Sequence, residues 1–438
     1  MREMKDSGIE WIGDIPKEWE IIRLCYLIDG YKAGPFGSAL IMDKLDDEGE
    51  ILVYTPETIA TRDTDLSTNK YLPDSRRQEM EQFFVEPGDI IFPIVGSLGR
   101  AMLIKKNMPE GIINQRLAKF HLSSDKITYP YFMRLFGQSS FFETYIELSC
   151  RGSIIVNLTK AILHDMPVPV PPIDEQKRIA AYLDSKCSEI DALTADIQSQ
   201  IDTLEQYKRS VITEAVTRGL DKNVEMKDSG FDWLGFIPST WQTRKGKYIF
   251  VQRNERGNSI ELQLLSPTQK YGVIPQDLYE EISGYKAVKL DEKTDYSLLK
   301  TIHKGDYCIS LRSFQGGFEY SEYEGVVSPA YQVFYPVIEV FRDYYKHLFK
   351  TQIFIDKMNS FTMSLRDGKN IAFADFGNTY LPIPPIQEQQ RIADYLDRKC
   401  AEIDSIITEK KQQIETIEEY KKSLIFEYVT GKKEVPAV

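Results

Sequence analysis

The chain has 438 residues, of which 42% are hydrophobic and 27% charged, a composition that can bury ordinary globular cores and allows about three domains. No stretch approaches the ~18 consecutive apolar residues of a membrane span, and the first residues lack the apolar segment of a secretory signal, so we expect a soluble, cytoplasmic protein. The 54 basic residues against 66 acidic ones give a net charge of −12, which argues against a nucleic-acid binder unless basic patches are local or a partner is more basic.

Two pairs of similar segments indicate that the chain is an internal duplication. The short repeat, residues 4–19 and 226–241, is identical at 10 of 16 positions, at an offset of 222. The long repeat, residues 169–191 and 382–404, is identical at 17 of 23 positions, at an offset of 213. The first copy is therefore about nine residues longer than the second (222 − 213 = 9).

Between the repeats lie two bodies, residues 20–168 and 242–381, which share little sequence beyond the fragments Pro87-Gly88-Asp89 and Lys304-Gly305-Asp306. Both are rich in glycine, aromatic and β-branched residues in short alternating runs, which predicts irregular sheets with a few helices, an α+β class of mixed α/β type. Strands are expected at 89–92, 307–310 and 326–333, and helices at 129–142 and 341–357. Similar flanking repeats around dissimilar bodies suggest two related modules that recognise different ligands.

The segments after the bodies predict two long helices. Pro-Pro at 171–172 and at 384–385 ends a strand and precedes a helix start. Apolar positions then recur in alternating steps of four and three, the mark of a coiled coil. The seam so predicted contains Leu183, Cys187, Ile190, Thr194, Ile197, Ile201, Leu204, Lys208, Val211 and Ala215, and then Leu396, Cys400, Ile403, Ile407, Lys410, Ile414, Ile417, Lys421, Leu424 and Tyr428.

We expect the two helices, the first spanning about 175–215, to pack antiparallel on each other and to separate the bodies in a pseudo-twofold repeat. The alternative is two amphipathic helices, each docked on its own body. The domain division predicted is 1–170 (short repeat and first body), 171–220 (first helix), 221–383 (short repeat and second body) and 384–433 (second helix).

Catalytic patterns are absent from the sequence. There is no GxxxxGK[ST] phosphate-binding loop, no Gly-x-Ser-x-Gly and no carboxylate nuclease pattern. The four histidines show no metal-ligand spacing, and the five cysteines form neither a CxxC pair nor a disulfide framework. We predict no catalytic residue, no cofactor and no metal.

Loop clusters of the bodies contain the side chains that read DNA, because Arg, Lys, Asn and Gln match base edges and phosphates. The candidates in the first body are Lys32, Ser38, Arg76, Arg77, Arg100, Asn114, Gln115, Arg116 and Arg151. Those in the second body are Arg253, Asn254, Arg256, Lys270, Arg312, Gln315, Arg366, Lys369 and Asn370. Each cluster can equally be a solvated polar loop, and the net charges of the bodies, −4 (16 basic, 20 acidic) and +1 (18 basic, 17 acidic), give no basic patch.

The two copies of the short repeat, the pattern Pro-Pro-x-x-Glu-Gln-x-x-Ile-Ala-x-x-Leu-Asp at 171–184 and 384–397, and Gly-Pro-Phe-Gly-Ser at 34–38 resemble one family. The chain is similar, over almost its whole length, to the specificity subunit of type I DNA restriction–modification systems. The resemblance implies that each body is a target-recognition domain for one half of a split, asymmetric double-stranded DNA site. It also implies that the helices form an antiparallel spacer, and that the subunit itself catalyses nothing.

The resemblance further implies two kinds of partner: two methyltransferase subunits, which methylate adenine, and restriction subunits, which cleave DNA. The short repeat and the long helices are then the expected docking surfaces for the methyltransferase subunits. The alternative function is a non-catalytic coiled-coil scaffold whose two bodies bind proteins.

Overall fold

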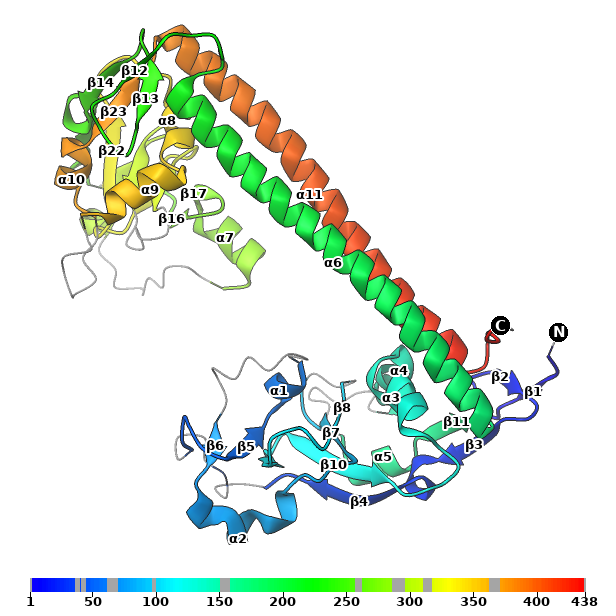
Figure 1. The fold of residues 1–438 in the computed structure, drawn as a ribbon. Helices are drawn as coiled ribbons and strands as arrows, with labels where there is room; N and C mark the ends of the chain where they lie inside the picture. The colour runs from blue at the N-terminus through cyan, green and yellow to red at the C-terminus, as the bar shows by residue number, and fades with distance from the viewer. Residues whose placement is uncertain are drawn as a thin grey trace. The chain divides into compact units, whose positions relative to one another are not determined.

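The computed structural model of the chain divides into two compact units (Figure 1). The residues that it describes are 2–35, 40, 45–60, 70–96, 100–149, 158–256, 262–285, 296–309, 317–361 and 371–436. Unit 1 comprises Met1–Ile197 and Lys411–Val438, and unit 2 comprises Gln198–Lys410. Each unit therefore contains one body and a part of each long helix.

The elements of unit 1 follow the expected pattern of short strands and few helices. Its strands are β1 (Met4–Asp6), β2 (Asp14–Pro16), β3 (Glu20–Arg23), β4 (Ile28–Ala33), β5 (Ile51–Tyr54), β6 (Tyr71–Leu72), β7 (Asp89–Pro93), β8 (Met102–Leu103), β9 (Gly111–Ile113), β10 (Leu117–Leu122) and β11 (Pro167–Val170). Its helices are α1 (Pro56–Ala60), α2 (Arg77–Met80), α3 (Tyr129–Gly137), α4 (Ser140–Ser149) and α5 (Lys160–His164), followed by the first long helix, α6 (Ile173–Arg218).

Unit 2 repeats much of this order. Its strands are β12 (Met226–Asp228), β13 (Phe236–Pro238), β14 (Gln242–Lys245), β15 (Phe250–Gln252), β16 (Leu265–Thr268), β17 (Gly272–Pro275), β18 (Lys300–Ile302), β19 (Tyr307–Ile309), β20 (Phe318–Tyr320), β21 (Gly325–Val327), β22 (Gln332–Pro336) and β23 (Tyr380–Ile383). Its helices are α7 (Gln276–Ser283), α8 (Arg342–Leu348), α9 (Gln352–Asn359) and α10 (Phe373–Asn378), followed by the second long helix, α11 (Ile386–Val429).

The two bodies are built on the same sheet. The order β4-β10-β7-β8 in unit 1 matches β15-β22-β19-β20 in unit 2, and every described pairing in both sheets is antiparallel. The short repeat forms the hairpins β1–β2 and β12–β13, and the ends of each body pair as β3–β11 and β14–β23. The additional strands differ, since β5 pairs with β9 in parallel in unit 1 whereas unit 2 adds the antiparallel pairs β16–β17 and β18–β21.

Three local predictions need correction. The expected helix at 129–142 is two helices, α3 and α4, because the buried Ser139 hydroxyl donates to the Leu135 carbonyl (2.6 Å) and accepts from the Phe141 amide (3.2 Å) at the break. The expected helix at 341–357 is likewise α8 and α9, with Thr351 accepting from the Phe354 amide to cap α9. The expected strand at 326–333 is β21 and β22, joined by a turn in which the Tyr331 amide donates to Ser328.

Aromatic rings fill the core of each body. In unit 1 Phe120, on β10, contacts Phe92 on β7 and Phe136 on α3, with ring centroids 5.2 and 5.7 Å apart. In unit 2 Phe250, on β15, contacts Phe334 (5.5 Å) and Tyr307 (5.6 Å). All of these rings are buried, so each sheet presents one face to the helices that cover it.

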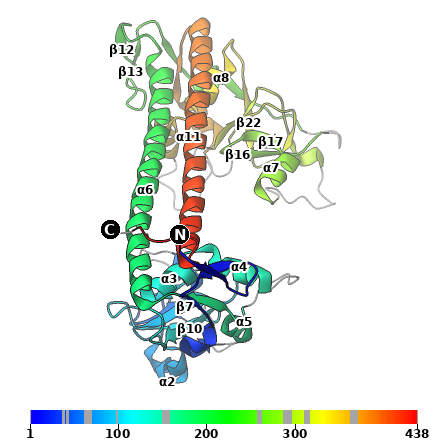
Figure 2. The same ribbon diagram turned by 90° about the vertical axis from the view of Figure 1, so that its right-hand side faces the viewer.

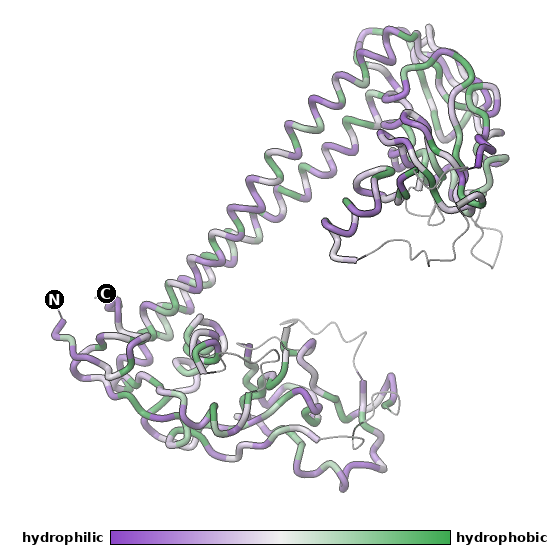
Figure 3. Tube along the Cα trace, turned by 180° about the vertical axis from the view of Figure 1, so that it is seen from behind, coloured by the Kyte–Doolittle hydropathy of each residue, from purple (hydrophilic) through white to green (hydrophobic). Residues whose placement is uncertain are grey.

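The long helices pack on each other within both units and run in opposite directions. In unit 1 the seam lysine Lys421 on α11 bonds Asp191 on α6, and in unit 2 the equivalent Lys208 on α6 bonds Asp404 on α11. Figure 2 shows α6 beside α11, and Figure 3 shows hydrophobic and hydrophilic residues alternating along both helices. Burial raises the pKa of the seam thiols Cys187 and Cys400, which suits packing residues.

Equivalent hydrogen bonds fasten both long helices to the bodies. At the start of α6, the buried Gln176 accepts from the Thr128 amide (2.8 Å) and donates to the Pro171 carbonyl (2.8 Å). At the start of α11, 213 residues later, Gln389 accepts from the Phe341 amide (2.9 Å) and donates to the Pro384 carbonyl (2.8 Å). These contacts therefore explain the glutamine of the Glu-Gln pair in both copies of the long repeat.

The far ends of the helices are also fastened, each to the other copy's body. The Tyr131 hydroxyl in unit 1 donates to the Val429 carbonyl of α11 (2.8 Å), and the equivalent Tyr344 in unit 2 donates to the Val216 carbonyl of α6 (2.7 Å). Each body thus holds the start of its own helix and the end of the other. The predicted fold class, two related α+β bodies and an antiparallel pair of long helices, is confirmed.

Candidate nucleic-acid interface

The Gly-Asp fragment shared by the bodies forms the same turn before β7 and before β19. Gly88 and Gly305 have φ of 102° and 89°, a region that favours glycine. The following aspartates are buried: Asp89 accepts from Lys119 Nζ (2.9 Å), whereas Asp306 accepts from Arg253 Nε (2.7 Å) and Nη2 (3.1 Å). Arg253, a predicted DNA contact, therefore uses its guanidinium to hold this turn.

Three predicted arginines of the first body are paired with carboxylates. Arg76 bonds Glu79, and Arg116 donates to Glu57 (3.0 Å). Arg77 makes two 2.8 Å bonds to Glu110, which lower the pKa of that carboxyl. Exposed pairs of this kind stabilise little and can exchange a carboxylate for a phosphate.

Two described glycines near predicted DNA contacts of the first body lie against the segment that carries Asn114, Gln115 and Arg116. Gly34 lies against the Asn114 carbonyl so closely that a Cβ would sit 1.9 Å from its oxygen. A Cβ on Gly96 would be 3.3 Å from a guanidinium nitrogen of Arg116. Gly34 and Gly96 thus allow the chain to approach residues 114–116 closely.

The remaining predicted residues of the first body have different environments. Lys32, on β4, bonds Gln82 and has its ammonium 5.3 Å from the ring centre of Phe83. Asn114 is buried, and its side-chain oxygen accepts from the Arg116 amide (3.0 Å), so it shapes the turn. In the part of the chain that the structure describes, the exposed Arg100 and Gln115 make no hydrogen bond or ion pair.

In the second body, the exposed Asn254 and Arg256 follow β15 beside Arg253. Arg256 donates to the Leu298 carbonyl (2.7 Å), which ties this segment to the start of β18. Lys270 is exposed at the β16–β17 turn, with its ammonium 5.0 Å from the ring centre of Tyr271. Among the described residues, no hydrogen bond, ion pair or ring contact joins Lys270 to Arg253, Asn254 or Arg256.

Lys270 and Tyr271 border a cleft of about 540 Å³ that also reaches α8 and both long helices of unit 2. On its floor Lys350 bonds both oxygens of the buried Glu319, at 2.6 and 2.7 Å. Burial raises the pKa of Glu319 to about 6, and Lys350 opposes that shift. The cleft thus combines exposed cations with aromatic rings.

Seven predicted residues lie outside the described residues: Ser38, Arg151, Arg312, Gln315, Arg366, Lys369 and Asn370. They remain predictions. The described residues contain no cluster of three or more His, Cys, Asp or Glu side chains that could hold a metal ion. None of their helices has the length and hydropathy of a membrane span.

His303 makes a pH-dependent contact close to Arg253, through Glu255. Its ring lies 3.1 Å from Glu255 and 2.9 Å from Glu324. Burial lowers its pKa and Arg253 opposes protonation, but the two carboxylates more than offset both, so the pKa of His303 is raised.

We expect the stability that His303 contributes to be full below its ordinary pKa of about 6.5 and to be lost as the pH rises through its raised folded value. Unfolding of the wild type and of His303→Gln, measured from pH 5 to pH 8, should differ most at pH 5. An equal difference at both ends of the range would contradict this assignment.

Sequence reasoning missed the residues that position the bodies, because it searched for ligand-binding side chains. Gln176, Gln389, Tyr131 and Tyr344 form the anchors of the long helices. All four could have been found from the offset of 213, since each position carries the same residue in both copies. Glu175, which accepts from the Trp19 ring nitrogen (3.0 Å) and pairs with Arg2, also ties the short repeat of unit 1 to α6.

A family model described as the type I restriction modification DNA specificity domain matches residues 16–203 and 238–416. The two matches cover both bodies and most of both helices.

Curated relatives are similar over nearly the full chain. The putative type I restriction enzyme MjaX specificity subunit of Methanocaldococcus jannaschii is 24% identical, with 96% of this chain and 95% of the relative covered. The MjaVIII specificity subunit of the same organism is 25% identical (95% and 93% covered). The EcoKI specificity subunit of Escherichia coli is 21% identical (71% and 67% covered).

A solved structure described as the basis of complex assembly and conformational transition of the type I R-M system has the same fold. Its TM-score is 0.64 at 13% identity, and 96% of this chain and 99% of that one are covered.

Proposed function

Because the chain belongs to the family of type I restriction–modification DNA specificity subunits, we propose that it is the sequence-recognition subunit of such a complex. It catalyses no reaction itself and directs adenine methylation and restriction by partner subunits. The observation that carries the proposal is the match of the family model to both copies of the duplicated chain. The partners are two methyltransferase subunits and restriction subunits, and the complex acts on DNA in the cytoplasm.

Each body reads one half of a split, asymmetric double-stranded site. The shared four-stranded sheet supports a common way of presenting loops, and the different additional strands support different half-sites. The functional division is 1–170 and 221–383 for the two target-recognition domains with their short repeats, and 171–220 and 384–433 for the two spacer helices.

Eight of the predicted DNA contacts fall into two groups. Arg100, Gln115, Asn254 and Lys270 are exposed and make no ion pair among the described residues, so they can contact DNA without losing one. The paired arginines Arg76, Arg77, Arg116 and Arg253 hold the loops instead, and only the exposed pairs would exchange with phosphate. We therefore expect direct DNA contacts mainly from the four residues that make no ion pair.

Lys270 gives a measurable case. The variant Lys270→Gln should lower the salt dependence of DNA binding by about 0.9 in the slope of log K against log salt, the loss of one phosphate contact, with the sequence preference unchanged. Lys222→Gln, an exposed position between α6 and β12, is the matched control and should leave the slope as it is. Equal slopes for the wild type and Lys270→Gln would remove Lys270 from the interface.

The long helices set the gap between the half-sites. Inserting one heptad after Ile197 and another at the equivalent point after Lys410 preserves the seam and adds about 10.5 Å of helix, or about three base pairs. The recognised gap should lengthen by up to this amount, with both half-site sequences unchanged, in a selection of bound DNA. An active complex with the original gap would show that the helices do not set it.

The methyltransferase subunits dock on the helices and the short repeats. Large apolar side chains are exposed on both helices at equivalent positions, Leu193 and Tyr207 on α6 and Ile406 and Tyr420 on α11. Their recurrence at equivalent positions supports docking of the same kind of partner on both helices. Each unit contains one pair of them, which fits one methyltransferase subunit for each unit.

The direct test is selection of random duplex DNA with the purified complex of this chain and its methyltransferase subunits. We expect one bipartite motif with two unlike halves. A complex without any sequence preference would instead support the protein-binding scaffold, and a single continuous motif would overturn the two-body model.

A further inference from the structure

We propose that Arg134 and His347 are equivalent positioning residues that attach the two bodies to the long helices, and that the histidine makes the attachment of the second body depend on pH. Reading of the half-site of unit 2 then weakens as the pH rises through the range in which histidine loses its proton, whereas reading by unit 1 does not. This inference rests on the proposed function, because it concerns how firmly each body is held when it reads DNA.

The two residues occupy the same place in the two copies. Arg134 in α3 and His347 in α8 are 213 residues apart, the offset of the long repeat, and both are followed by Leu-Phe. In unit 1 the Arg134 Nε donates to Asp184 Oδ1 on α6 (3.0 Å). In unit 2 the His347 Nε2 lies 2.9 Å from Asp397 Oδ1 on α11. Because Asp184 and Asp397 are also 213 residues apart, the two bridges share their acceptor and differ in their donor.

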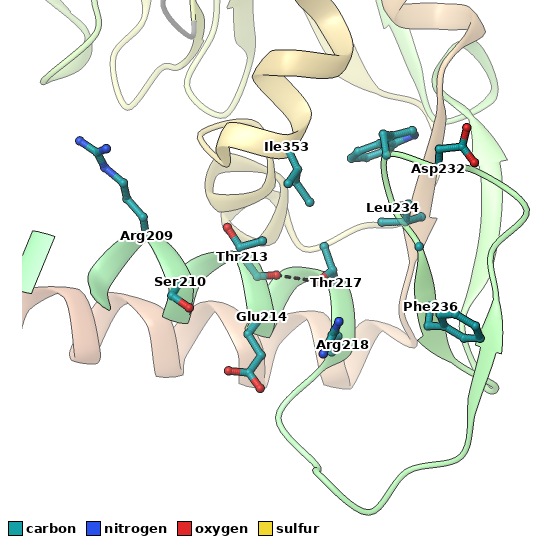
Figure 4. A pocket seen from close by; sticks show the side chains of 12 residues that line it. Arg209, Ser210, Thr213, Glu214, Thr217, Arg218, Asp232, Leu234, Phe236 and Ile353 are labelled. Carbon is teal, nitrogen blue, oxygen red and sulfur yellow. Dashed lines mark hydrogen bonds between the residues drawn. The ribbon is translucent and has the colours of Figure 1, made fainter. Parts of the chain in front are cut away.

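Each bridge adds a point of attachment to the glutamine and tyrosine contacts of its body. In unit 2 the Gln389 side chain holds the start of α11, and the Tyr344 hydroxyl holds the end of α6. Figure 4 shows that end of α6 from close by, where Thr213 lies beneath Ile353 of the body. Asp397 lies about two turns further along α11 than Gln389, so the bridge restrains the tilt of α8 on α11.

The two donors differ in how they carry charge. Arginine keeps its positive charge throughout the physiological range, whereas a histidine side chain changes charge between about pH 5 and pH 8. The hydrogen bond from His347 lowers the pKa of Asp397, so this carboxylate stays ionised throughout that range. The bridge of unit 2 is therefore an ion pair only while the histidine is protonated, and as the pH rises it becomes a weaker bond from a neutral ring.

The other titratable side chains around His347 come from α8 and the residues after it, from β20 and the loop after it, from α6 and from α11. They are Asp343, Lys346, Lys350, Glu319, Tyr320, Glu322, Tyr323, Lys208 and Cys400. The three lysines pair with Glu322, Glu319 and Asp404. Burial raises the pKa of Glu319 to about 6, so this carboxyl titrates in the same range. A test of the bridge therefore has to compare proteins that all keep Glu319.

A chain of contacts joins the bridge to a predicted DNA contact. His347 and Lys270 line the same cleft of about 540 Å³. Lys350, just after α8, donates to the carbonyl of Gln269, the residue before Lys270 (3.3 Å). Unit 1 has Gly137 in the place of Lys350. A change in how α8 sits on α11 is therefore passed to the turn that carries Lys270.

The test is binding of duplex DNA by the complex of this chain with its methyltransferase subunits, at pH 5.5 and at pH 8. The duplexes carry the selected target, either complete or with one half-site scrambled, and the ratio of the two affinities measures how well one body reads. Between these pH values the ratio for the half-site of unit 2 should fall about three- to tenfold more in the wild type than in His347→Arg, which copies unit 1.

Two further variants complete the comparison. Arg134→His should bring the same loss to the half-site of unit 1. His347→Gln, a donor without a charge, should keep the ratio of unit 2 at its high-pH level and replaces His347→Arg if that protein does not fold. Glu319 and His303 are unchanged in every variant, so their own titration does not enter the differences.

An equal pH dependence of the wild type and of the His347 variants, or an Arg134→His complex that reads the half-site of unit 1 equally well at both pH values, would overturn the inference and leave the proposed function intact. A wild-type complex without sequence preference at either pH would overturn both.

Discussion

A chain in which residues 242–381 are replaced by the corresponding body of another family member is expected to keep one half-site of its DNA target and to exchange the other completely. The physical reason is that the body of unit 2 joins the long helices through contacts at defined positions. Its two ends are the paired strands β14 and β23, and the graft carries all of β14 and the first half of β23. The body is also held by the Tyr344 hydroxyl on the Val216 carbonyl of α6 and by the Gln389 side chain of α11 on the Phe341 amide. Apolar residues of both helices pack into its core.

A graft therefore has to retain a tyrosine at position 344, whereas the loops between the anchors are free to change. Methylation of a DNA library by the hybrid complex measures the result. The reciprocal exchange of residues 20–168 is the control and should change only the opposite half-site. Alteration of both half-sites by one graft would mean that the bodies do not read DNA independently.

The variant Gln176→Ala is expected to destabilise unit 1 by about 3 kcal/mol or more. Gln176 is fully buried, and its amide bonds the Thr128 amide and the carbonyls of Lys126 and Pro171. Alanine leaves these three backbone groups buried without partners, at about 1–3 kcal/mol for each group that water cannot reach. Because unit 1 holds the start of α6 through this residue, the helix should lose its fixed direction at the body.

Denaturant unfolding gives the free energy of unfolding of the wild type and the variant. The neighbouring Lys177→Ala is the matched control, since the Lys177 side chain is exposed and its substitution should change stability by no more than about 0.5 kcal/mol. A Gln176→Ala protein as stable as the control would show that the Glu-Gln pair of the long repeat serves a different purpose.

The order of bodies and long helices was predictable because it depends on the internal repeats and on the spacing of apolar residues along the helices. The long repeat located both helices, and the steps of four and three gave the seam, in which Leu183 and Leu396 are fully buried. The helix expected over 175–215 runs from Ile173 to Arg218, since the short motif after Pro-Pro already forms its first turn. The period of the apolar residues and the positions of the Pro-Pro pairs therefore predicted the bounds of both helices to within a few residues.

The bodies were less predictable because their elements end at side-chain contacts. Ser139 and Thr351 break the expected helices by bonding nearby backbone groups, and nothing in the apolar pattern marks them. The candidate DNA contacts were chosen by residue type, and type does not reveal pairing across the fold. Arg253 bonds Asp306, 53 residues away, so its role in the turn became visible only from the structure.

Modified-base sequencing of genomic DNA from cells with and without this gene tests most directly whether the two bodies read the two halves of one DNA site. We expect adenine methylation at one split motif with two unlike halves to disappear when the gene is removed. Methylation that is lost at a continuous, unsplit motif, or that does not change at any motif, would contradict the claim that the two bodies of this chain read two halves of one DNA site.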